Sequence, residues 1–408
     1  MPVSIKRFNI NNYRSCRQTA IDLNPGLSVL VGTNGSGKTN ILNAVLLLNK
    51  LLAVRPWTDS PERSEAISKL DVIYEVDQTS IKYKSSVSIF TSHQEREAIR
   101  GLEESWHFND ALGGQSLRFP AWFIDVNNDE YRHLEKRVYS RRLLKHGQDP
   151  AFTFDVPPER LWPSLQSVRD FVKGIVYYSA SQFTNPSECP TYIELENEQL
   201  SWRRTQGHEP LLFDMYNASK SERFTEYLSI VGRDGIRLVD TIMFLSVKVP
   251  TGQVQVRSGG RIIRKSIKRE LIVPIFVIDG IKLSPNQLSE GTFKTLAILF
   301  YLITSSSSIV LLEEPEVCVH HGLLLSIVEL IKSYSREKQI VVSTHSDFLL
   351  DQVEPEQVLL VTKKRRSGTR VQRLPESMST RGYKALKQYL QASGNLGEYW
   401  RQTDFENG

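Results

Sequence analysis

The strongest constraint on this chain is the sequence GTNGSGKT at residues 32–39, which has the pattern GxxxxGK[ST]. An apolar run precedes it at 27–31 and a helical pattern follows at 40–50, so the expected order is strand, glycine-rich loop, helix. Such a loop turns several backbone N–H groups toward one anion, and the helix adds the positive end of its dipole. Lys38 is expected to reach the β- and γ-phosphates and Thr39 to bind Mg²⁺. The predicted nucleotide contacts are Asn34, Gly35, Gly37, Lys38 and Thr39.

Composition narrows the class of protein but does not identify a function. The chain has 408 residues, of which 40% are hydrophobic and 24% charged, as in ordinary globular proteins. No run approaches about 18 apolar residues, and the N-terminus lacks an apolar signal core, so neither a membrane segment nor secretion is expected. Three scattered cysteines fit a reducing cytoplasm. The 51 basic and 46 acidic residues leave a net charge of +5, too small to indicate nucleic acid by itself.

Strand patterns alternate with helical patterns along most of the chain, which predicts an α/β sheet. The nucleotide-binding core is expected to combine residues 1–55 with 270–408. Residues 56–269 are expected to form a β subdomain and an insertion, with one core strand near 174–183. Within that region, the charged segment 95–104 is predicted to be a surface helix.

A second candidate site begins at residue 309, where the sequence reads IVLLEEP. A buried strand there would place two carboxylates at its C-terminal end, beside the glycine-rich loop. Glu313 is the candidate for the Mg²⁺ shell, and Glu314 for orienting and deprotonating an attacking water. A strand that ends in a charged turn is the plainer alternative, and the loop upstream favours the catalytic interpretation.

Two further segments become candidates for the nucleotide site because of their order along the chain. The sequence LSEGT at 288–292 opens a helical pattern, with Ser289 as a candidate N-cap; alone it indicates only a capped helix. The sequence STHS at 343–346 follows an apolar strand and ends in His345, and a lone histidine there is more often structural. The order of glycine-rich loop, LSEGT, paired glutamates and histidine is what makes both segments candidates for a site.

That order resembles ABC-type ATPases of the RecF/SMC/OLD-like branch, which includes many antiphage ATPases. The resemblance implies a head domain with a mixed central sheet, an antiparallel β subdomain and a helical or irregular insertion. It makes residues 32–39 the Walker A motif, 288–292 the signature loop and 309–315 the Walker B motif. Roles implied only by the resemblance are His345 as switch histidine, Ser289 and Gly291 as contacts to the γ-phosphate, Gln182 as a Q-loop metal ligand, and Arg14 of INNYRS as a phosphate contact.

The chain departs from the family pattern at several positions. Glu313 stands where Walker B usually has Asp, so hydrolysis is expected to be slow. Glu290 replaces the first of the two signature glycines, and His321 stands where the family usually has Pro. The resemblance covers about 1–55 and 270–400 well and the middle of the chain poorly.

The resemblance also implies how the protein works. Two copies would pack head to tail around ATP and Mg²⁺, so an ATP-dependent homodimer or higher oligomer is expected. Because the chain has no evident second active site, cleavage is expected to belong to a separate effector nuclease or toxin, as in Septu- and PARIS-like defence systems. The main alternative is a RecF-like repair ATPase that binds duplex DNA directly. Two basic clusters leave DNA open as a partner, although both also suit solvated turns: Arg257–Arg269 and Lys363–Arg370.

Two less favoured functions remain. The cytoplasmic subunit of a membrane transporter is disfavoured by the large irregular segment 56–269. A P-loop scaffold without turnover would be distinguished by replacing Glu314, which should abolish hydrolysis only if that residue is the base.

Overall fold

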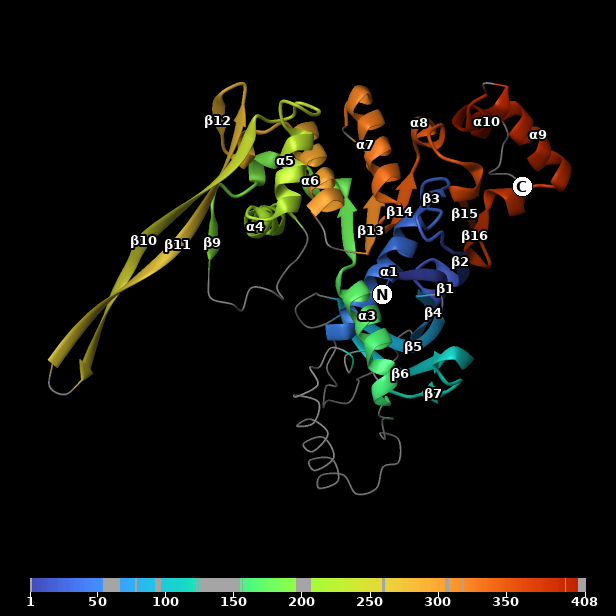
Figure 1. The fold of residues 1–408 in the computed structure, drawn as a ribbon, viewed down its shortest axis with the longest axis horizontal. Coiled ribbons are helices and arrows are strands. Elements are labelled where there is room, and N and C mark those ends of the chain that lie inside the picture. Colours follow the sequence, from blue (N-terminus) through green and yellow to red (C-terminus); the bar gives the residue numbers. More distant parts are fainter. Residues whose placement is uncertain are drawn as a thin grey trace, which may run out of the picture. The chain divides into compact units, whose positions relative to one another are not determined.

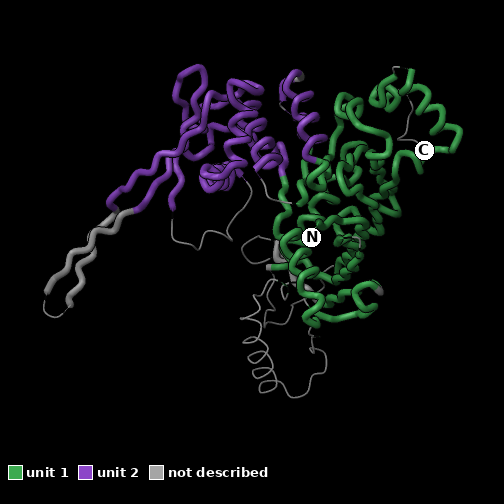
Figure 2. The backbone as a smooth tube through the Cα atoms, viewed as in Figure 1, with its two compact units in different colours: residues 1–177, 306–313, 335–408 green, residues 178–305, 314–334 purple. Residues whose placement is uncertain are grey.

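A computed structural model of this protein describes residues 2–53, 67–119, 157–195, 207–304, 308–392 and 394–402. Within these ranges, residues 78, 92–96, 259–260 and 318 are excepted. The single residues 121, 124 and 155 are also described. The chain forms two compact units (Figure 2). The first unit contains residues 1–177, 306–313 and 335–408, and the second contains 178–305 and 314–334. This division by contacts differs from the division at 56 and 269 expected from the motifs.

The central sheet has six strands in the order β16-β15-β3-β14-β13-β8. Strand β3 pairs in parallel with β14 and β15, and β14 pairs in parallel with β13, whereas β16 is antiparallel to β15. All residues of β3 and β14 are buried, as expected for strands covered on both faces. The strands are β3 Leu27–Val31, β8 Val176–Ser179, β13 Ile309–Glu313, β14 Gln339–Thr344, β15 Val358–Lys364 and β16 Gly368–Arg373.

A second sheet in the first unit is antiparallel, with the order β2-β1-β4-β5-β6-β7. Burial alternates along β4, which gives this sheet one core-facing side and one exposed side. The strands are β1 Val3–Tyr13, β2 Cys16–Asp22, β4 Ile67–Val76, β5 Thr79–Thr91, β6 Glu97–Phe108 and β7 Ser116–Leu117. Helix α1, Lys38–Ala53, contacts strands of both sheets and joins them in one hydrophobic core.

The remaining helices of the first unit complete its core and its C-terminal part (Figure 1). Helix α3 contacts α1 and β4, and α8 contacts α10. Their bounds are α3 Trp162–Lys173, α8 Asp347–Leu350, α9 Thr380–Gln391 and α10 Leu396–Gln402. Among the described residues, no helix has both the length and the hydropathy needed to cross a membrane.

The second unit packs helices around a long, mostly buried one and carries its own small sheet. Helix α6, Glu290–Thr304, contacts α4 His208–Ala218, α5 Glu222–Val231 and α7 His321–Tyr334. The sheet order is β10-β11-β12, and β9 also pairs with β11. Its strands are β9 Ile193–Leu195, β10 Thr241–Ser258, β11 Arg261–Ile278 and β12 Ile281–Leu283. Strands β10 and β11 form the long hairpin seen in Figure 1.

The α/β prediction is confirmed, including the mixed central sheet and the antiparallel β region. The helix predicted at 95–104 is wrong, because residues 97–108 form β6 and pair with β5 over most of its length. The charge of this segment favours a surface helix, but its hydrogen-bonded pairing with β5 stabilises it as a strand. Most of 105–165 had no predicted structure, and much of that region lies outside the described residues.

Candidate functional site

The glycine-rich loop connects β3 to α1 as predicted, and two of its glycines have left-handed backbone angles. Gly35 has φ of 77° and Gly37 has φ of 113°, values that favour glycine. A Cβ on Gly37 would approach the Thr369 Oγ1 to 2.1 Å, and a Cβ on Gly32 would approach the Val361 carbonyl oxygen to 2.0 Å. The loop is therefore held tightly against the β15–β16 hairpin. Asn34 and Gly35 are exposed at its tip, where a ligand can reach their backbone.

Lys38 is buried at the base of this loop, and its ammonium has several acceptors. Nζ lies 2.8 Å from the Gly32 carbonyl oxygen, 3.2 Å from that of Thr33 and 2.6 Å from Nε2 of His345. An ammonium only donates hydrogen bonds, so Nε2 of His345 accepts and the neutral ring carries its proton on Nδ1. The predicted switch histidine thus contacts the predicted phosphate-binding lysine, although 307 positions separate them.

The Thr39 hydroxyl and Glu313 lie together beside Lys38, at the start of α1 and the end of β13. Thr39 Oγ1 donates to one oxygen of Glu313, and the Tyr177 hydroxyl donates to the other. Mg²⁺ takes oxygen ligands and typically binds one or two carboxylates together with substrate phosphates. The hydroxyl and carboxylate present here fit a Mg²⁺–triphosphate group, which Thr39 and Glu313 could hold. Tyr177 was not among the predicted site residues.

A chain of hydrogen bonds holds the underside of the loop. The Asn40 side-chain nitrogen donates to Ser15 Oγ at 2.6 Å, and Ser15 Oγ lies 2.8 Å from Thr369 Oγ1. Because Thr369 Oγ1 donates to the Ser36 carbonyl oxygen at 2.8 Å, Ser15 must be the donor to Thr369. Two distant segments, at Ser15 and Thr369, and the first turn of α1 thereby fix the conformation of the loop. The network also places the β1–β2 turn, and with it the exposed Arg14 at φ of 50°, next to the loop.

Two buried groups lie in or beside this network. The Ser36 hydroxyl is buried and has no hydrogen-bond partner among the described residues. A buried hydroxyl without a partner at this place is consistent with a loop that closes around a polar ligand. Burial raises the pKa of the Cys16 thiol, although the nearby hydroxyl groups of Thr19, Ser15 and Thr369 oppose the shift. Cys16 is thus a packed, unreactive thiol.

Glu314, the predicted general base, follows β13 and begins the second unit. Its φ is 47°, in the left-handed region that residues other than glycine seldom adopt. Such backbone strain persists only where the surrounding structure imposes it, and it is frequent at functional sites. The Val317 N–H donates to the Glu314 carbonyl oxygen at 3.1 Å and closes the turn that holds this conformation.

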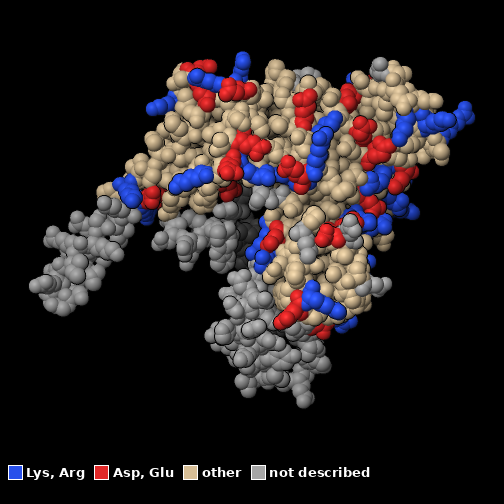
Figure 3. All heavy atoms as spheres, in the orientation of Figure 1, with Lys and Arg blue, Asp and Glu red and all other residues tan. Residues whose placement is uncertain are grey.

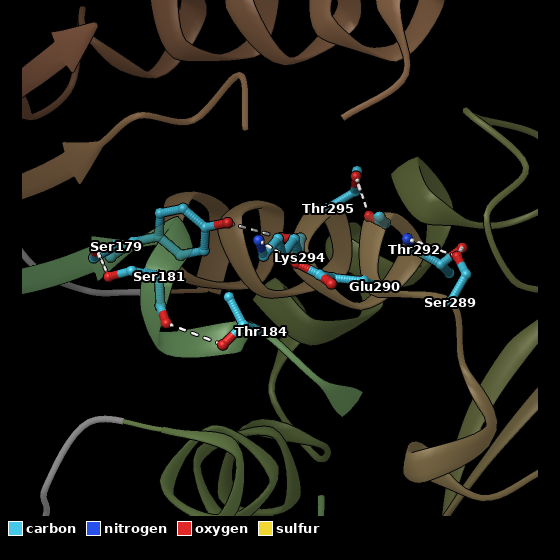
Figure 4. A network of polar contacts seen from close by, with 10 residues as sticks. Ser179, Ser181, Thr184, Ser289, Glu290, Thr292, Lys294 and Thr295 are labelled. Atoms are coloured by element: carbon cyan, nitrogen blue, oxygen red, sulfur yellow. Dashed lines mark hydrogen bonds and ion pairs between the residues drawn. The ribbon is translucent and has the colours of Figure 1, made fainter. Parts of the chain in front are cut away.

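The signature loop, residues 288–292, leads into α6 in the second unit. Ser289 Oγ accepts from the Thr292 N–H at 3.2 Å, so Ser289 is the N-cap that the sequence predicted. Ser289 is exposed and Gly291 is partly exposed. Gln182 lies in the 180–183 segment, which contacts α6, and the Tyr178 hydroxyl donates to the Lys294 carbonyl oxygen at 3.5 Å (Figure 4).

The predicted site residues fall into two groups. In the first unit, the structure brings Lys38, Thr39, Glu313 and His345 into contact. Gln182, Ser289, Gly291 and Glu314 belong to the second unit. The sequence reasoning missed Tyr177, Ser15, Asn40 and Thr369. A tyrosine within a predicted core strand was a weak signal, and the other three residues gave none. No cluster of three or more potential metal-binding side chains occurs in the part of the chain that the structure describes.

Comparisons with protein families identify both regions of the chain that carry these motifs. Residues 4–139 match the model described as AAA ATPase domain. Residues 253–351 match the model described as AAA domain, putative AbiEii toxin, Type IV TA system. The first match includes the glycine-rich loop, and the second includes the signature loop, both glutamates and His345.

Individual relatives are more distant or match only in part. The DNA replication and repair protein RecF of Acidothermus cellulolyticus is 44% identical over 57 residues, covering 14% of this chain and 15% of RecF. The endonuclease GajA of Bacillus cereus is 22% identical over 376 residues, covering 88% of this chain and 58% of GajA. The chain thus spans less than two thirds of either relative.

Among solved structures, the Smc head bound to the C-winged helix domain of ScpA has a TM-score of 0.47 at 12% identity, covering 94% of this chain and 99% of that one. The two family models together match the glycine-rich loop, the signature loop, both glutamates and His345, so the regions of the chain that carry these motifs are similar to AAA ATPase domains.

Proposed function

We propose that this chain binds ATP with Mg²⁺ and hydrolyses it in a site that a second copy completes. The observation that carries the proposal is the contact of Lys38 with His345, beside the contact of Thr39 with Glu313. These four residues come from three segments far apart in the sequence, and their residue types are those that nucleotide hydrolysis requires. Lys38 would leave its carbonyl acceptors for the phosphates, and Thr39 and Glu313 would hold the metal.

The chemical step is assigned to Glu314. Bound Mg²⁺ neutralises charge that develops on the phosphates. Glu314 orients the attacking water and accepts its proton. His345 accepts a hydrogen bond from Lys38 before nucleotide binds, so a triphosphate that draws Lys38 away frees the His345 ring from this contact. Contact of Nε2 with a γ-phosphate oxygen then requires a proton on Nε2, because the phosphate oxygen only accepts. His345 thereby reports the state of the nucleotide.

The requirement for a second copy rests on the signature loop. Ser289 is exposed at the N-terminus of a 15-residue helix, a place suited to holding an anion. In the proposed dimer, Ser289 and Gly291 of one copy contact the γ-phosphate held by Lys38 of the other. ATP then stabilises the dimer, and hydrolysis loosens it.

The biological role that we propose is control of a separate effector nuclease or toxin in antiphage defence. Two matches support it: the distant similarity to GajA, an endonuclease, extends over 88% of this chain, and the second family model is described as a putative toxin domain. A strain carrying this gene and its neighbours should resist phage, and Lys38→Met in this chain should abolish the resistance. Unchanged resistance in that variant would contradict the role.

The hydrolysis site itself is tested with Glu314→Gln. This change removes the proton acceptor and preserves the size of the side chain, so turnover should fall by about 100-fold or more while ATP binding persists. ATP-dependent dimers of the variant should live longer than those of the parent, which analytical ultracentrifugation measures. The neighbouring carboxylate Glu316→Gln is the matched control. Normal hydrolysis by Glu314→Gln would show that the base is another group.

The alternative is a RecF-like ATPase that binds duplex DNA directly, and the RecF match over 57 residues favours it. On the face shown in Figure 3, described basic and acidic side chains are interspersed, which does not favour a broad DNA-binding surface there. Of the two basic clusters, Lys363 to Arg366 and Arg370 are exposed, whereas the side chains of 251–268 lie outside the description. Tight, ATP-dependent binding of duplex DNA by the purified chain alone would support the alternative.

A further inference from the structure

A buried lysine lies one helical turn behind the signature loop, at Lys294 in α6. Its side chain is only 1% exposed, and its Nζ lies 2.6 Å from Oε1 of Glu290, whose side chain is 38% exposed. The two residues are four positions apart on the same helix, which places them on one face. In Figure 4, Glu290 points along α6 toward Lys294, whereas Ser289 and Thr292 contact each other at the start of the helix.

Glu290 occupies a demanding position for a carboxylate. It is the first residue of α6, next to Ser289, where the backbone N–H groups and the helix dipole attract negative charge. An unrestrained carboxylate would interact with these groups itself. It would also repel any phosphate that approaches the same end of the helix. The helix can receive an anion only if the Glu290 carboxylate is held elsewhere and its charge is compensated.

We propose that Lys294 is a positioning residue that draws the Glu290 carboxylate back along α6 and neutralises it, so that the signature loop can accept a partner copy's triphosphate. This inference rests on the proposed composite site. Glu290 replaces a signature glycine, and Lys294 compensates for the charge that the replacement introduces. The first turn of α6 is also held by Thr295, whose Oγ1 donates to the Gly291 carbonyl oxygen at 2.8 Å.

A purely structural ion pair would behave differently under mutation. Removing one partner of an ion pair is costly when the remaining charge is buried. Removing only the carboxylate leaves the buried Lys294 charge unpaired, whereas Lys294→Met leaves Glu290, which is 38% exposed and accessible to water. A structural role therefore predicts that Lys294→Met is harmless and that Glu290→Gln lowers the melting temperature. A positioning role predicts that Lys294→Met, although folded, fails to associate, and that adding Glu290→Gln to it restores association.

The experiment uses the full chain carrying Glu314→Gln, so that ATP is not consumed. Into this parent we would introduce Lys294→Met, Glu290→Gln and both together. Self-association with ATP and Mg²⁺ is measured by analytical ultracentrifugation, nucleotide binding with a fluorescent ATP analogue at low protein concentration, and folding by the melting temperature. Lys294→Met should weaken self-association by at least about tenfold with unchanged nucleotide binding, and the double variant should return to within about threefold of the parent.

Two results would overturn the inference: Lys294→Met associates like the parent, or the double variant stays as weak as Lys294→Met while remaining folded. A parent that binds nucleotide without associating would instead refute the composite site, and the inference with it. The separate binding measurement tells these failures apart, because it reports on Lys38 and its loop alone.

Discussion

The two motif-bearing regions of this molecule are built in different ways. In the first unit, the nucleotide loop depends on long-range contacts: Lys38 bonds to His345, Thr39 to Glu313, and the loop carbonyl of Ser36 to Thr369. In the second unit, the signature loop is organised locally. Ser289 caps its own helix, and Glu290 pairs with Lys294 four residues later.

This difference indicates what each region can do alone. A loop held in place by three distant segments is preorganised before any ligand arrives, which suits it to bind nucleotide within one copy. A capped helix end offers an exposed anion-binding position but few side chains to hold a ligand by itself, which suits it to complete another copy's site. Mutations in the first region should therefore affect binding, and those in the second should affect association.

The largest expected effect comes from Lys38→Met. Loss of the charged donor to the phosphates should weaken ATP binding by about 100-fold or more, roughly 3 kcal/mol. Isothermal titration calorimetry with ATP and Mg²⁺ measures it. Lys50→Met, on the exposed last turn of the same helix, is the control and should bind normally. Equal affinities of the two variants would remove Lys38 from the site.

Ser289→Ala separates the two regions most directly. Loss of the hydroxyl should leave ATP binding to single copies unchanged but weaken ATP-dependent self-association by about tenfold. The missing N-cap should also lower the free energy of unfolding by about 1 kcal/mol. Ser221→Ala removes the equivalent N-cap of α5 and should lose only stability. If both variants associate equally well, the signature loop has no role between copies.

Tyr177→Phe tests a contact that the motifs did not reveal. Without its hydroxyl, Glu313 loses the donor that orients one carboxylate oxygen, so the Mg²⁺ concentration for half-maximal hydrolysis should rise by about tenfold. Affinity for ATP without metal should not change. Tyr192→Phe, an exposed tyrosine, serves as the control. An unchanged Mg²⁺ dependence would make Tyr177 a packing residue only.

The smallest effect is expected far from the motifs, at Glu104 on β6. Burial raises the pKa of this carboxyl from 4.5 to about 7, although hydrogen bonds from Tyr83 and the Ala121 N–H oppose the shift. The folded state therefore binds a proton more tightly than the unfolded state. This contribution to stability is complete below pH 4.5 and is lost as the pH rises through about 7.

Glu104→Gln should remove that pH dependence. Between pH 5 and 8 the parent should lose roughly 1–2 kcal/mol more stability than the variant, which urea denaturation at both pH values measures. ATP binding should be the same in both. Glu103→Gln on the exposed side of the strand is the control. Parallel pH profiles for parent and variant would place the Glu104 pKa near its ordinary value.

Prediction from the sequence succeeded where local pattern and fold agree. The strand, glycine-rich loop and helix predicted at 27–50 are found as β3, the loop and α1, and the N-cap predicted at Ser289 precedes α6, because glycine and capping residues mark these places locally. Strand β6 was predicted as a helix, because charged residues obscured its alternation and its pairing with β5 was invisible in the sequence. Helix α3 was missed in a region of mixed composition.

The sequence by itself predicted which residues form the nucleotide-binding loop: glycines at fixed spacing, a lysine and a threonine follow β3, and the left-handed backbone angles at Gly35 and Gly37 favour glycine there. The tertiary structure alone decided which groups support them. Tyr177 reaches Glu313, and Thr369 reaches Ser36, across 136 and 333 positions. Such contacts arise from the order of strands in a sheet, and no local pattern records that order.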